Sequence, residues 1–189
     1  MGESIFWTKM KRPFLFATLT LIGLLFGCGE KQPDLSNLIT HQSGDIVFNY
    51  PGNWKVTEDS ITATIHNLFV ETPGDAIVII QSYPLEMVQD LKSFSKDFSE
   101  GASLGTPLVS INKAPFSGLR KKWGYDWISE DFEIVLLGES VPHKRIYGSK
   151  EVGDCQIFLI LQVPEADYQK VEKGFYLIVN SLTGDRKNN

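Results

Sequence analysis

The chain has 189 residues, with 18 Lys and Arg against 23 Asp and Glu and a formal net charge of −5. This acidic balance argues against nucleic-acid binding, because such proteins need a basic footprint that neutralises phosphates. It also argues against membrane attachment through charge alone, since anionic headgroups attract basic segments. With 42% hydrophobic and 12% aromatic residues, the composition is that of a globular protein.

The first 27 residues have the layout of an export signal. Lys9, Lys11 and Arg12 supply a positively charged flank, and residues 14–26 form an apolar core. A core of this length fits the roughly 7–15 residues typical of a signal peptide. It is shorter than the about 20 apolar residues that span a bilayer, so the run does not predict a membrane helix.

The apolar core ends in the stretch Leu25-Phe26-Gly27-Cys28. This stretch resembles the lipobox of bacterial lipoproteins, in which the cysteine sulfur receives a diacylglycerol and cleavage makes the cysteine the new N-terminus. Leu25 and Gly27 fit the pattern, whereas Phe26 stands where the family has a small or modest side chain. The resemblance implies a signal peptide over 1–27 and a lipid on Cys28. An ordinary secretory signal with a bystander cysteine is the alternative.

Residues 28–44 are polar, contain Pro33 and show no sustained hydrophobic period. We expect them to form a flexible tether between the membrane and a folded domain. Gly29 follows the cysteine where an Asp would resemble an inner-membrane retention signal. The expected location is therefore the cell membrane through a lipid anchor, on the periplasmic side of the outer membrane if the host is Gram-negative.

A folded domain is expected over residues 45–184, with a polar tail over 185–189. Alternating apolar residues over 46–50 predict its first strand. Residues 76–80 and 156–163 are the most apolar strand-like runs. Strands of this kind are typical of the centre of a sheet that is covered on both faces.

Two segments change to the helical period. In the first, Met87, Leu91, Phe94 and Phe98 form one stripe, and Gly101 is expected to end the helix. In the second, which follows Pro164 and ends at Gly184, the apolar face consists of Tyr168, Val171, Phe175, Ile178 and Leu182. Gly174 is expected to weaken this helix slightly. Runs of strands separated from helices predict an α+β domain, with a central, mainly antiparallel sheet of six or seven strands flanked by helices.

Two stretches resemble PsbP-like domains. Phe48-Asn49-Tyr50-Pro51-Gly52-Asn53-Trp54, a strand that runs into a Pro-x-x-Trp turn, resembles the start of such domains. The closing helix over residues 175–182 resembles their end, and the order of elements agrees over 45–183. The resemblance implies an antiparallel sheet between helices, as in photosystem-associated proteins and many bacterial lipoproteins. The family has no shared catalytic residues, so the resemblance implies none here.

No pattern in the domain indicates catalysis, a metal or a cofactor. The three histidines, which lack a paired metal-ligand spacing, are His41, His66 and His143. We expect His66 to face solvent. Glu130, Asp131 and Glu133 could serve as an acid–base pair, but no partner base is evident, so we expect a solvated turn. Cys155 lies in an apolar strand and is expected to be buried and inert.

Two basic clusters suggest a binding surface. They are Arg120-Lys121-Lys122 and His143-Lys144-Arg145, and they meet if their strands are neighbours. The expected partner-binding residues are Arg120, Lys122, Lys144 and Arg145. Strand alternation predicts that Arg120 and Lys122 share one face, while Lys121 lies on the face of Trp123 and Trp127.

An aromatic cluster follows the first basic one. Trp123, Tyr125 and Trp127 alternate with other residues and are expected on one side of a strand. They either fill the core under a helix or line an exposed groove for a peptide or small ligand. The sequence leaves both alternatives open.

Together these features predict a membrane-anchored cell-envelope lipoprotein that acts as a non-catalytic binding or assembly accessory. Its expected partners are the membrane, through the lipid, and an envelope protein, with no nucleic acid. The first alternative is an envelope protein that binds a small ligand in a pocket between sheet and helix. The second is an envelope hydrolase, which requires a nucleophile within hydrogen-bond reach of a base.

Overall fold

The structure is a computed structural model, and it describes residues 32–44, 46–62, 64–87, 89–104, 109–122, 124–136 and 138–184. The predicted signal peptide over 1–27, the lipobox with Cys28, Trp123 and the tail over 185–189 lie outside these residues. Within the described part of the chain, no helix is long and apolar enough to span a membrane.

The larger of two sheets has eight strands. Seven of them follow the order β3-β4-β5-β10-β9-β8-β6, and β7 pairs with β8 on the same edge as β6. All of these pairs are antiparallel. The strands are β3 (Lys55–Thr62), β4 (Ile65–Glu71), β5 (Ile77–Pro84), β6 (Val109–Lys113), β7 (Arg120–Lys122), β8 (Tyr125–Leu136), β9 (Glu139–Val152) and β10 (Cys155–Pro164).

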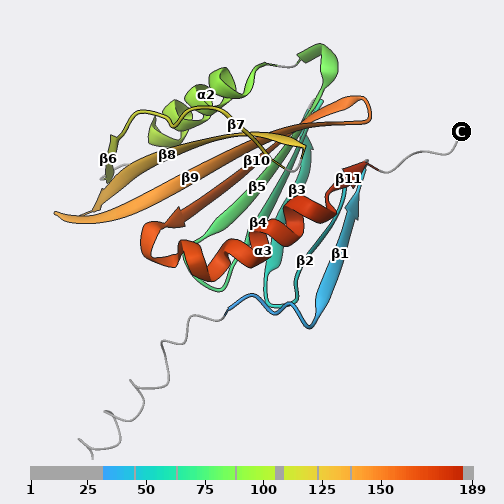
Figure 1. Cartoon of the computed structure of the whole chain (residues 1–189), viewed down its shortest axis with the longest axis horizontal. Coiled ribbons are helices and arrows are strands. Elements are labelled where there is room, and N and C mark those ends of the chain that lie inside the picture. Colours follow the sequence, from blue (N-terminus) through green and yellow to red (C-terminus); the bar gives the residue numbers. More distant parts are fainter. Residues whose placement is uncertain are drawn as a thin grey trace, which may run out of the picture. The chain divides into compact units, whose positions relative to one another are not determined.

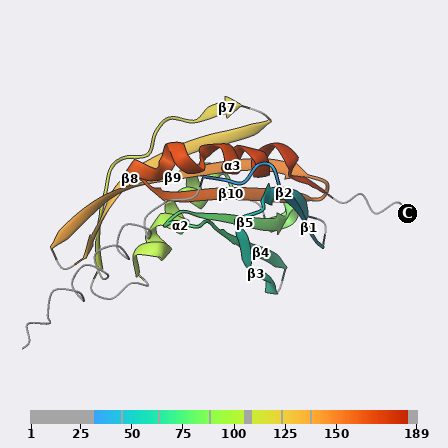
Figure 2. The same ribbon diagram turned by 90° about the horizontal axis from the view of Figure 1, so that it is seen from below.

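The smaller sheet has the order β1-β2-β11, with β1 (Leu38–Ser43), β2 (Ile46–Pro51) and β11 (Thr183–Gly184). Two α-helices lie on opposite sides of the larger sheet (Figures 1 and 2). They are α2 (Leu91–Leu104) and α3 (Tyr168–Ser181), and the 3₁₀ turns η1 (Leu85–Met87) and η2 (Glu165–Asp167) follow β5 and β10. The predicted α+β fold with a mainly antiparallel sheet flanked by helices is confirmed.

The central strands β5 and β10 bury side chains on both faces. Val78 and Leu159 join the core that contains the α3 residue Phe175. Ile79 and Phe158 alternate with them and join the core that contains Phe94 and Leu91 of α2. Two helices therefore explain why these two runs are apolar at nearly every position.

Helix α2 begins at a capping carboxylate. Asp90 Oδ1 accepts the backbone N–H groups of Lys92 and Ser93, each at 3.0 Å. The Phe94 ring stacks on Phe158 with 3.9 Å between centroids. Met87 does not join the stripe, since it lies in η1 and is 53% exposed. The helix also continues past Gly101, where a side chain would meet no neighbour, so the predicted stop at this residue is wrong.

Helix α3 packs its predicted apolar face against the small sheet and the larger one. Phe175 and Ile178 are fully buried in this core. Gly174 is buried beside Trp54, and a Cβ at this position would lie 2.5 Å from the Trp54 ring. Glycine is therefore needed at position 174 for the close approach of helix and ring. This packing role comes in addition to the predicted slight weakening of the helix.

The predicted flexible tether over 28–44 is wrong for its described part. Leu38–Ser43 forms β1, which pairs with β2 throughout. Before it, Asp34 N–H donates to Asn53 Oδ1 at 2.7 Å, and Asn53 Nδ2 donates to the Gln32 carbonyl at 2.9 Å. The sequence pattern does not reveal this strand, because only one of its faces is half-buried and no residue in it is fully buried. The domain therefore starts by Gln32.

Candidate binding groove

The first basic cluster lies in a hairpin formed by β7 and β8. The chain turns at Gly124, whose φ of 76° suits glycine. In the register, Arg120 pairs with Trp127 and Lys122 pairs with Tyr125. Directly paired residues in antiparallel strands share a face, so both cations lie on the α3 side of the sheet with the two aromatic residues.

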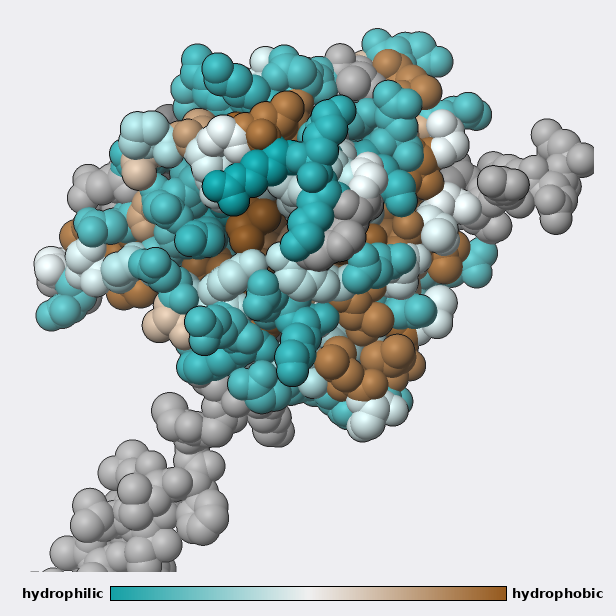
Figure 3. Space-filling model, viewed as in Figure 1, coloured by the Kyte–Doolittle hydropathy of each residue, from teal (hydrophilic) through white to brown (hydrophobic). Residues whose placement is uncertain are grey.

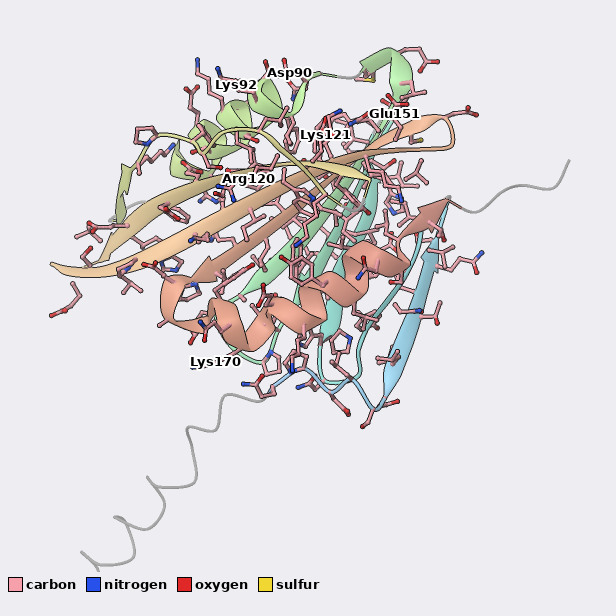
Figure 4. The ribbon with its side chains drawn as sticks, viewed as in Figure 1. Asp90, Lys92, Arg120, Lys121, Glu151 and Lys170 are labelled. Atoms are coloured by element: carbon pink, nitrogen blue, oxygen red, sulfur yellow. The ribbon has the colours of Figure 1, made fainter. Side chains whose placement is uncertain are left out.

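Lys121 lies on the opposite, α2 side. It pairs with Asp126 in the register, and its Nζ lies 3.4 Å from Asp126 Oδ1. Arg120 and Lys121, both labelled in Figure 4, are thus neighbours whose side chains leave β7 on opposite faces. The prediction that Lys121 shares a face with Trp127 is wrong, because the turn between β7 and β8 interrupts the alternation.

The second basic cluster is divided between the two faces of β9. Lys144 lines the α3 side, with its Nζ 3.3 Å from Asp131 Oδ1. Arg145 points to the α2 side and is 1% exposed, and its Nη1 lies 3.2 Å from Glu130 Oε2. Arg145 therefore cannot contact a partner, and the prediction that it belongs to the binding surface is wrong.

The aromatic cluster is also divided. Tyr125 is core: it is 2% exposed, and its hydroxyl donates to the Val179 carbonyl of α3 at 3.1 Å. Trp127 is half-buried, and its Nε1 donates to the Lys122 carbonyl at 2.9 Å. A Cβ at Gly148 would lie 2.5 Å from the Trp127 ring, so the glycine makes room for this ring on β9. Trp127 remains available to line a groove.

A groove of about 320 Å³ lies between β7–β9 and α3. Trp127, Ile146 and Phe175 supply apolar lining. The cations Arg120, Lys122 and Lys144 also line it, and none of the described lining residues is acidic. Figure 3 shows this side of the domain, with a hydrophobic patch in a hollow surrounded by hydrophilic side chains. The groove therefore combines positive charge with an apolar surface, and we call it the α3 groove.

Two tyrosines of α3 complete the α3 groove. Tyr168 donates its hydroxyl to Glu172 Oε1 at 3.1 Å. Burial, together with a hydrogen bond to Tyr176, raises the pKa of Tyr168 far above its usual value. Its hydroxyl therefore stays protonated at physiological pH. The sequence pattern identifies Tyr168 as part of an apolar face but gives no sign that either tyrosine lines a site.

Glu130 is the centre of a buried polar network on the α2 side. It is 1% exposed and lies within β8, so the predicted solvated turn is wrong. Ser99 of α2 donates to its Oε1 at 2.6 Å, and the Tyr147 hydroxyl donates to Oε2 at 2.9 Å. Arg145 completes the network, and its Nε donates to Gln162 Oε1 at 2.7 Å. The Glu130 carboxylate is closed off from solvent and accepts hydrogen bonds at both oxygens, so it and Arg145 have the features of a structural ion pair.

Two histidines converge on one carboxylate where the small sheet meets the larger one. His41 Nε2 lies 3.0 Å from Asp59 Oδ2, and His66 Nε2 lies 2.8 Å from Asp59 Oδ1. Ser43 Oγ donates to the same Oδ1 at 2.9 Å. The prediction that His66 faces solvent is wrong, because it is 7% exposed and directed at Asp59. The cluster joins β1 to β3 and β4.

Among the described residues, no group of three or more His, Cys, Asp or Glu side chains could hold a metal ion. His143 lies apart from the other two histidines, with its ring 5.4 Å from Phe132 and its Nδ1 2.9 Å from the Val141 carbonyl. Cys155, predicted to be buried, is half-buried at the start of β10.

A second cavity of about 810 Å³ lies on the α2 side of the sheet, between the start of α2 and residues 116–119. Leu91, Phe116 and Ile128 supply its apolar lining. Asp126 and Lys92 both line it, so its charges are mixed and favour no charged class of ligand.

The fold is similar to that of cyanobacterial PsbP (CyanoP) from Synechocystis sp. PCC 6803. That solution structure matches with a TM-score of 0.52 at 13% identity, over 84% of this chain and 97% of that one. The domain has a PsbP-like fold. At this identity the likeness shows the fold alone. The predicted resemblance to PsbP-like domains is therefore confirmed for architecture.

Two other solved structures are more distant. LpqN of Mycobacterium tuberculosis, involved in cell envelope biogenesis, matches with a TM-score of 0.42 at 12% identity, over 78% of this chain and 89% of that one. The Ran-binding protein Mog1p of Saccharomyces cerevisiae matches with a TM-score of 0.43 at 11% identity, over 77% and 95%. These scores support no conclusion about function. The sequence matches no protein-family model and no curated protein.

Proposed function

We propose that this chain is a non-catalytic binding protein of the cell envelope, anchored by a lipid on Cys28, whose α3 groove binds an anionic partner. The observation that carries the proposal is an apolar surface lined by Arg120, Lys122 and Lys144 and by no acidic residue of the described chain. Lys144 is also paired with Asp131 at 3.3 Å, so the test below is directed at Arg120 and Lys122. Guanidinium and ammonium groups form their strongest hydrogen bonds with carboxylates and phosphates. The apolar lining favours a partner that also presents a hydrophobic group.

The first candidate partner is an acidic segment of an envelope protein, in keeping with an accessory role. Such a segment would place an apolar side chain against Trp127 and carboxylates near Arg120 and Lys122. The second candidate is a small organic anion, favoured by the groove volume of about 320 Å³. That volume falls at the lower end of the roughly 300–1,000 Å³ of small-ligand sites.

The non-catalytic part of the proposal draws support from the inaccessibility of the buried acid. Glu130 is 1% exposed and accepts hydrogen bonds from Ser99, Tyr147 and Arg145. A general acid or base must come within hydrogen-bond reach of a substrate, and this carboxylate does not. The envelope hydrolase is therefore the least favoured of the three functions.

Binding of anilinonaphthalene sulfonate tests the groove, because this dye joins an anionic group to an aromatic body and fluoresces on apolar surfaces. In the variant Arg120→Gln/Lys122→Gln we expect about tenfold weaker binding, equivalent to about 1.4 kcal/mol. The matched control is Lys92→Gln/Lys121→Gln, which removes the same charge from the α2 side. Binding to the control should equal that of the wild type.

Salt gives a second readout of the same titration. Binding to the wild type should weaken as ionic strength rises, because added salt screens exposed charges. Binding to the Arg120→Gln/Lys122→Gln variant should change less. Equal affinities for both double variants, with no response to salt, would remove the α3 groove from the proposal.

The lipid anchor has its own test. Cys28→Ser should abolish incorporation of labelled lipid and release the domain from membranes or leave the precursor uncleaved. A diacylglycerol carries two acyl chains, which give stable attachment to a bilayer, whereas one chain gives only marginal attachment. Unchanged labelling and membrane retention in Cys28→Ser would refute the anchor without touching the groove.

A further inference from the structure

The chain is fixed to the domain very soon after Cys28. Asn53, in the turn after β2, holds the Gln32 carbonyl and the Asp34 N–H at 2.9 and 2.7 Å. The Gly52 N–H donates to the Asp34 carbonyl at 3.2 Å. A Cβ on Gly52 would lie 2.5 Å from the Asn37 carbonyl oxygen, so the two segments are in close backbone contact. Residues 32–37 therefore belong to the folded domain.

This attachment limits how far the domain can stand from a lipid on Cys28. Four residue steps separate Cys28 from Gln32. At no more than about 3.6 Å per residue, the chain spans at most about 14 Å between them. The headgroup regions add about 10–15 Å in total to a hydrocarbon core of about 30 Å, so a single headgroup layer takes up roughly half of that span. The end of the domain that carries Gln32 must then lie at the membrane surface.

That end of the domain presents two exposed leucines. Leu35 is 43% exposed and Leu38 is 48% exposed, although both are large apolar side chains. Asp34 accepts hydrogen bonds from Ser36, so the carboxylate next to them is already engaged within the segment. Apolar side chains at a bilayer surface gain free energy by entering the boundary between headgroups and acyl chains. The leucines therefore suit contact with lipid.

We infer that the domain rests directly on the bilayer, with residues 32–38 toward the membrane and Leu35 and Leu38 in contact with lipid. This inference rests on the proposed lipid on Cys28. It commits to a bilayer as the occupant of this surface, since the length of chain to the anchor leaves no room for a protein layer between them. The α3 groove plays no part in it.

The opposite end of the larger sheet provides a matched control. β3 starts after the turn at Asn53, and its start pairs with the end of β4, which in turn pairs with the start of β5. The start of β5 therefore lies at the same end of the sheet as Asn53. Met87 lies in η1, beyond the other end of β5, and is 53% exposed. Figure 1 shows η1 and the segment before β1 at opposite ends of the domain. Leu38 and Met87 are thus similarly exposed apolar residues at two different ends.

Quenching by brominated lipid tests the inference. The full chain carrying Cys155→Ser and either Leu38→Cys or Met87→Cys is purified from membranes, its lipid is verified by mass, and its single free thiol is labelled with bimane. The protein is then placed in phosphatidylcholine vesicles whose acyl chains are brominated. We expect loss of bimane fluorescence at position 38 and none at position 87.

The possible outcomes separate the inference from the anchor. Lipidated protein without quenching at position 38, or with equal quenching at both positions, overturns the inference and leaves the anchor intact. Protein that proves to carry no lipid overturns both. Leu35→Cys serves as a second probe if Leu38→Cys fails to fold, and the same expectation applies to it.

Discussion

At the scale of single residues, Glu130 and Arg145 form a buried ion pair with 3.2 Å between Arg145 Nη1 and Glu130 Oε2. Both side chains are about as buried as any in the core, at 1% exposure each. Arg145 also lies over the Phe132 ring at 4.1 Å, within reach of a cation–π interaction. Removing one member of such a pair leaves the other charge buried without compensation.

We predict that Glu130→Gln destabilises the domain by about 3–5 kcal/mol, the usual cost of breaking a buried ion pair. The control is Glu133→Gln in the same strand, where the carboxylate is exposed and bonds only to Ser140 among the described residues. That change should stay within about 0.5 kcal/mol. Urea denaturation measures both. Similar small losses for the two variants would mean that Glu130 is not the buried partner of Arg145.

Asp59 gives a pH dependence. Partial burial acts to raise the pKa of Asp59, but hydrogen bonds from His66, Ser43 and His41 and the attraction of His66 outweigh it and lower the pKa. A carboxyl whose pKa is lowered on folding stabilises the native state above its unfolded pKa, near 3.9. That stability is lost as the pH falls through the folded pKa.

We therefore predict that wild type and Asp59→Asn differ in unfolding free energy at pH 6, with the wild type more stable. The difference should begin to shrink as the pH falls below about 4, where the unfolded chain takes up the proton, and should vanish below the lower pKa of folded Asp59, where the side chain is neutral like Asn in both states. Glu58→Gln, an exposed neighbour in β3, is the control and should show no such convergence. Chemical denaturation at several pH values measures the effect, and a difference that stays constant with pH would contradict it.

At the scale of elements, two helical glycines should respond in opposite directions to the same change. Alanine is favoured over glycine in a helix by about 1 kcal/mol. Gly101 in α2 has no neighbour within 4 Å of the added Cβ, so Gly101→Ala should stabilise the domain by up to that amount. At Gly174 in α3 the Cβ would lie 2.5 Å from the Trp54 ring. Gly174→Ala should therefore destabilise it by about 1–3 kcal/mol, the usual cost of overpacking.

Thermal or denaturant unfolding of the two alanine variants measures this contrast. Both substitutions add one methyl group to a helix, so the helix preference is common to them and only the surroundings differ. A stabilising Gly174→Ala would show that α3 and Trp54 do not approach as closely as the structure has them.

The elements that the sequence predicts are those in which a buried face leaves a regular pattern of apolar residues. The runs at 76–80 and 156–163 predict the central strands because both faces are covered, and the stripe through Phe175 predicts α3 because that face is buried. β1 is missed because no residue in it is fully buried. The predicted order of strands and helices agrees with the structure because the apolar pattern of each element reflects the burial of that element alone.

The site was less predictable because it depends on where the chain turns and on which strands pair. The hairpin at Gly124 moves Lys121 to the opposite face from Trp127, and no alternation rule applies across a turn. Arg145 is buried only because β8 places Glu130 beside it. Of the four predicted cations, the structure brings Arg120, Lys122 and Lys144 to one groove and withdraws Arg145.

At the scale of the whole domain, the two faces of the sheet have different roles. The α2 side holds the buried polar network and a cavity of mixed charge. The α3 side holds a groove in which cations and aromatic side chains come together. One sheet thus supports a structural centre on one face and the candidate site on the other.

Photocrosslinking in intact cells tests the binding role of the α3 groove most directly. A benzoylphenylalanine in place of Tyr176 lies in the groove, and one in place of Lys96 lies on the exposed surface of α2. We predict an adduct of defined mass from position 176, lost when Arg120→Glu/Lys122→Glu is added, and no such adduct from position 96. An adduct at position 176 that survives the charge reversal, or one that forms equally from position 96, would contradict the account.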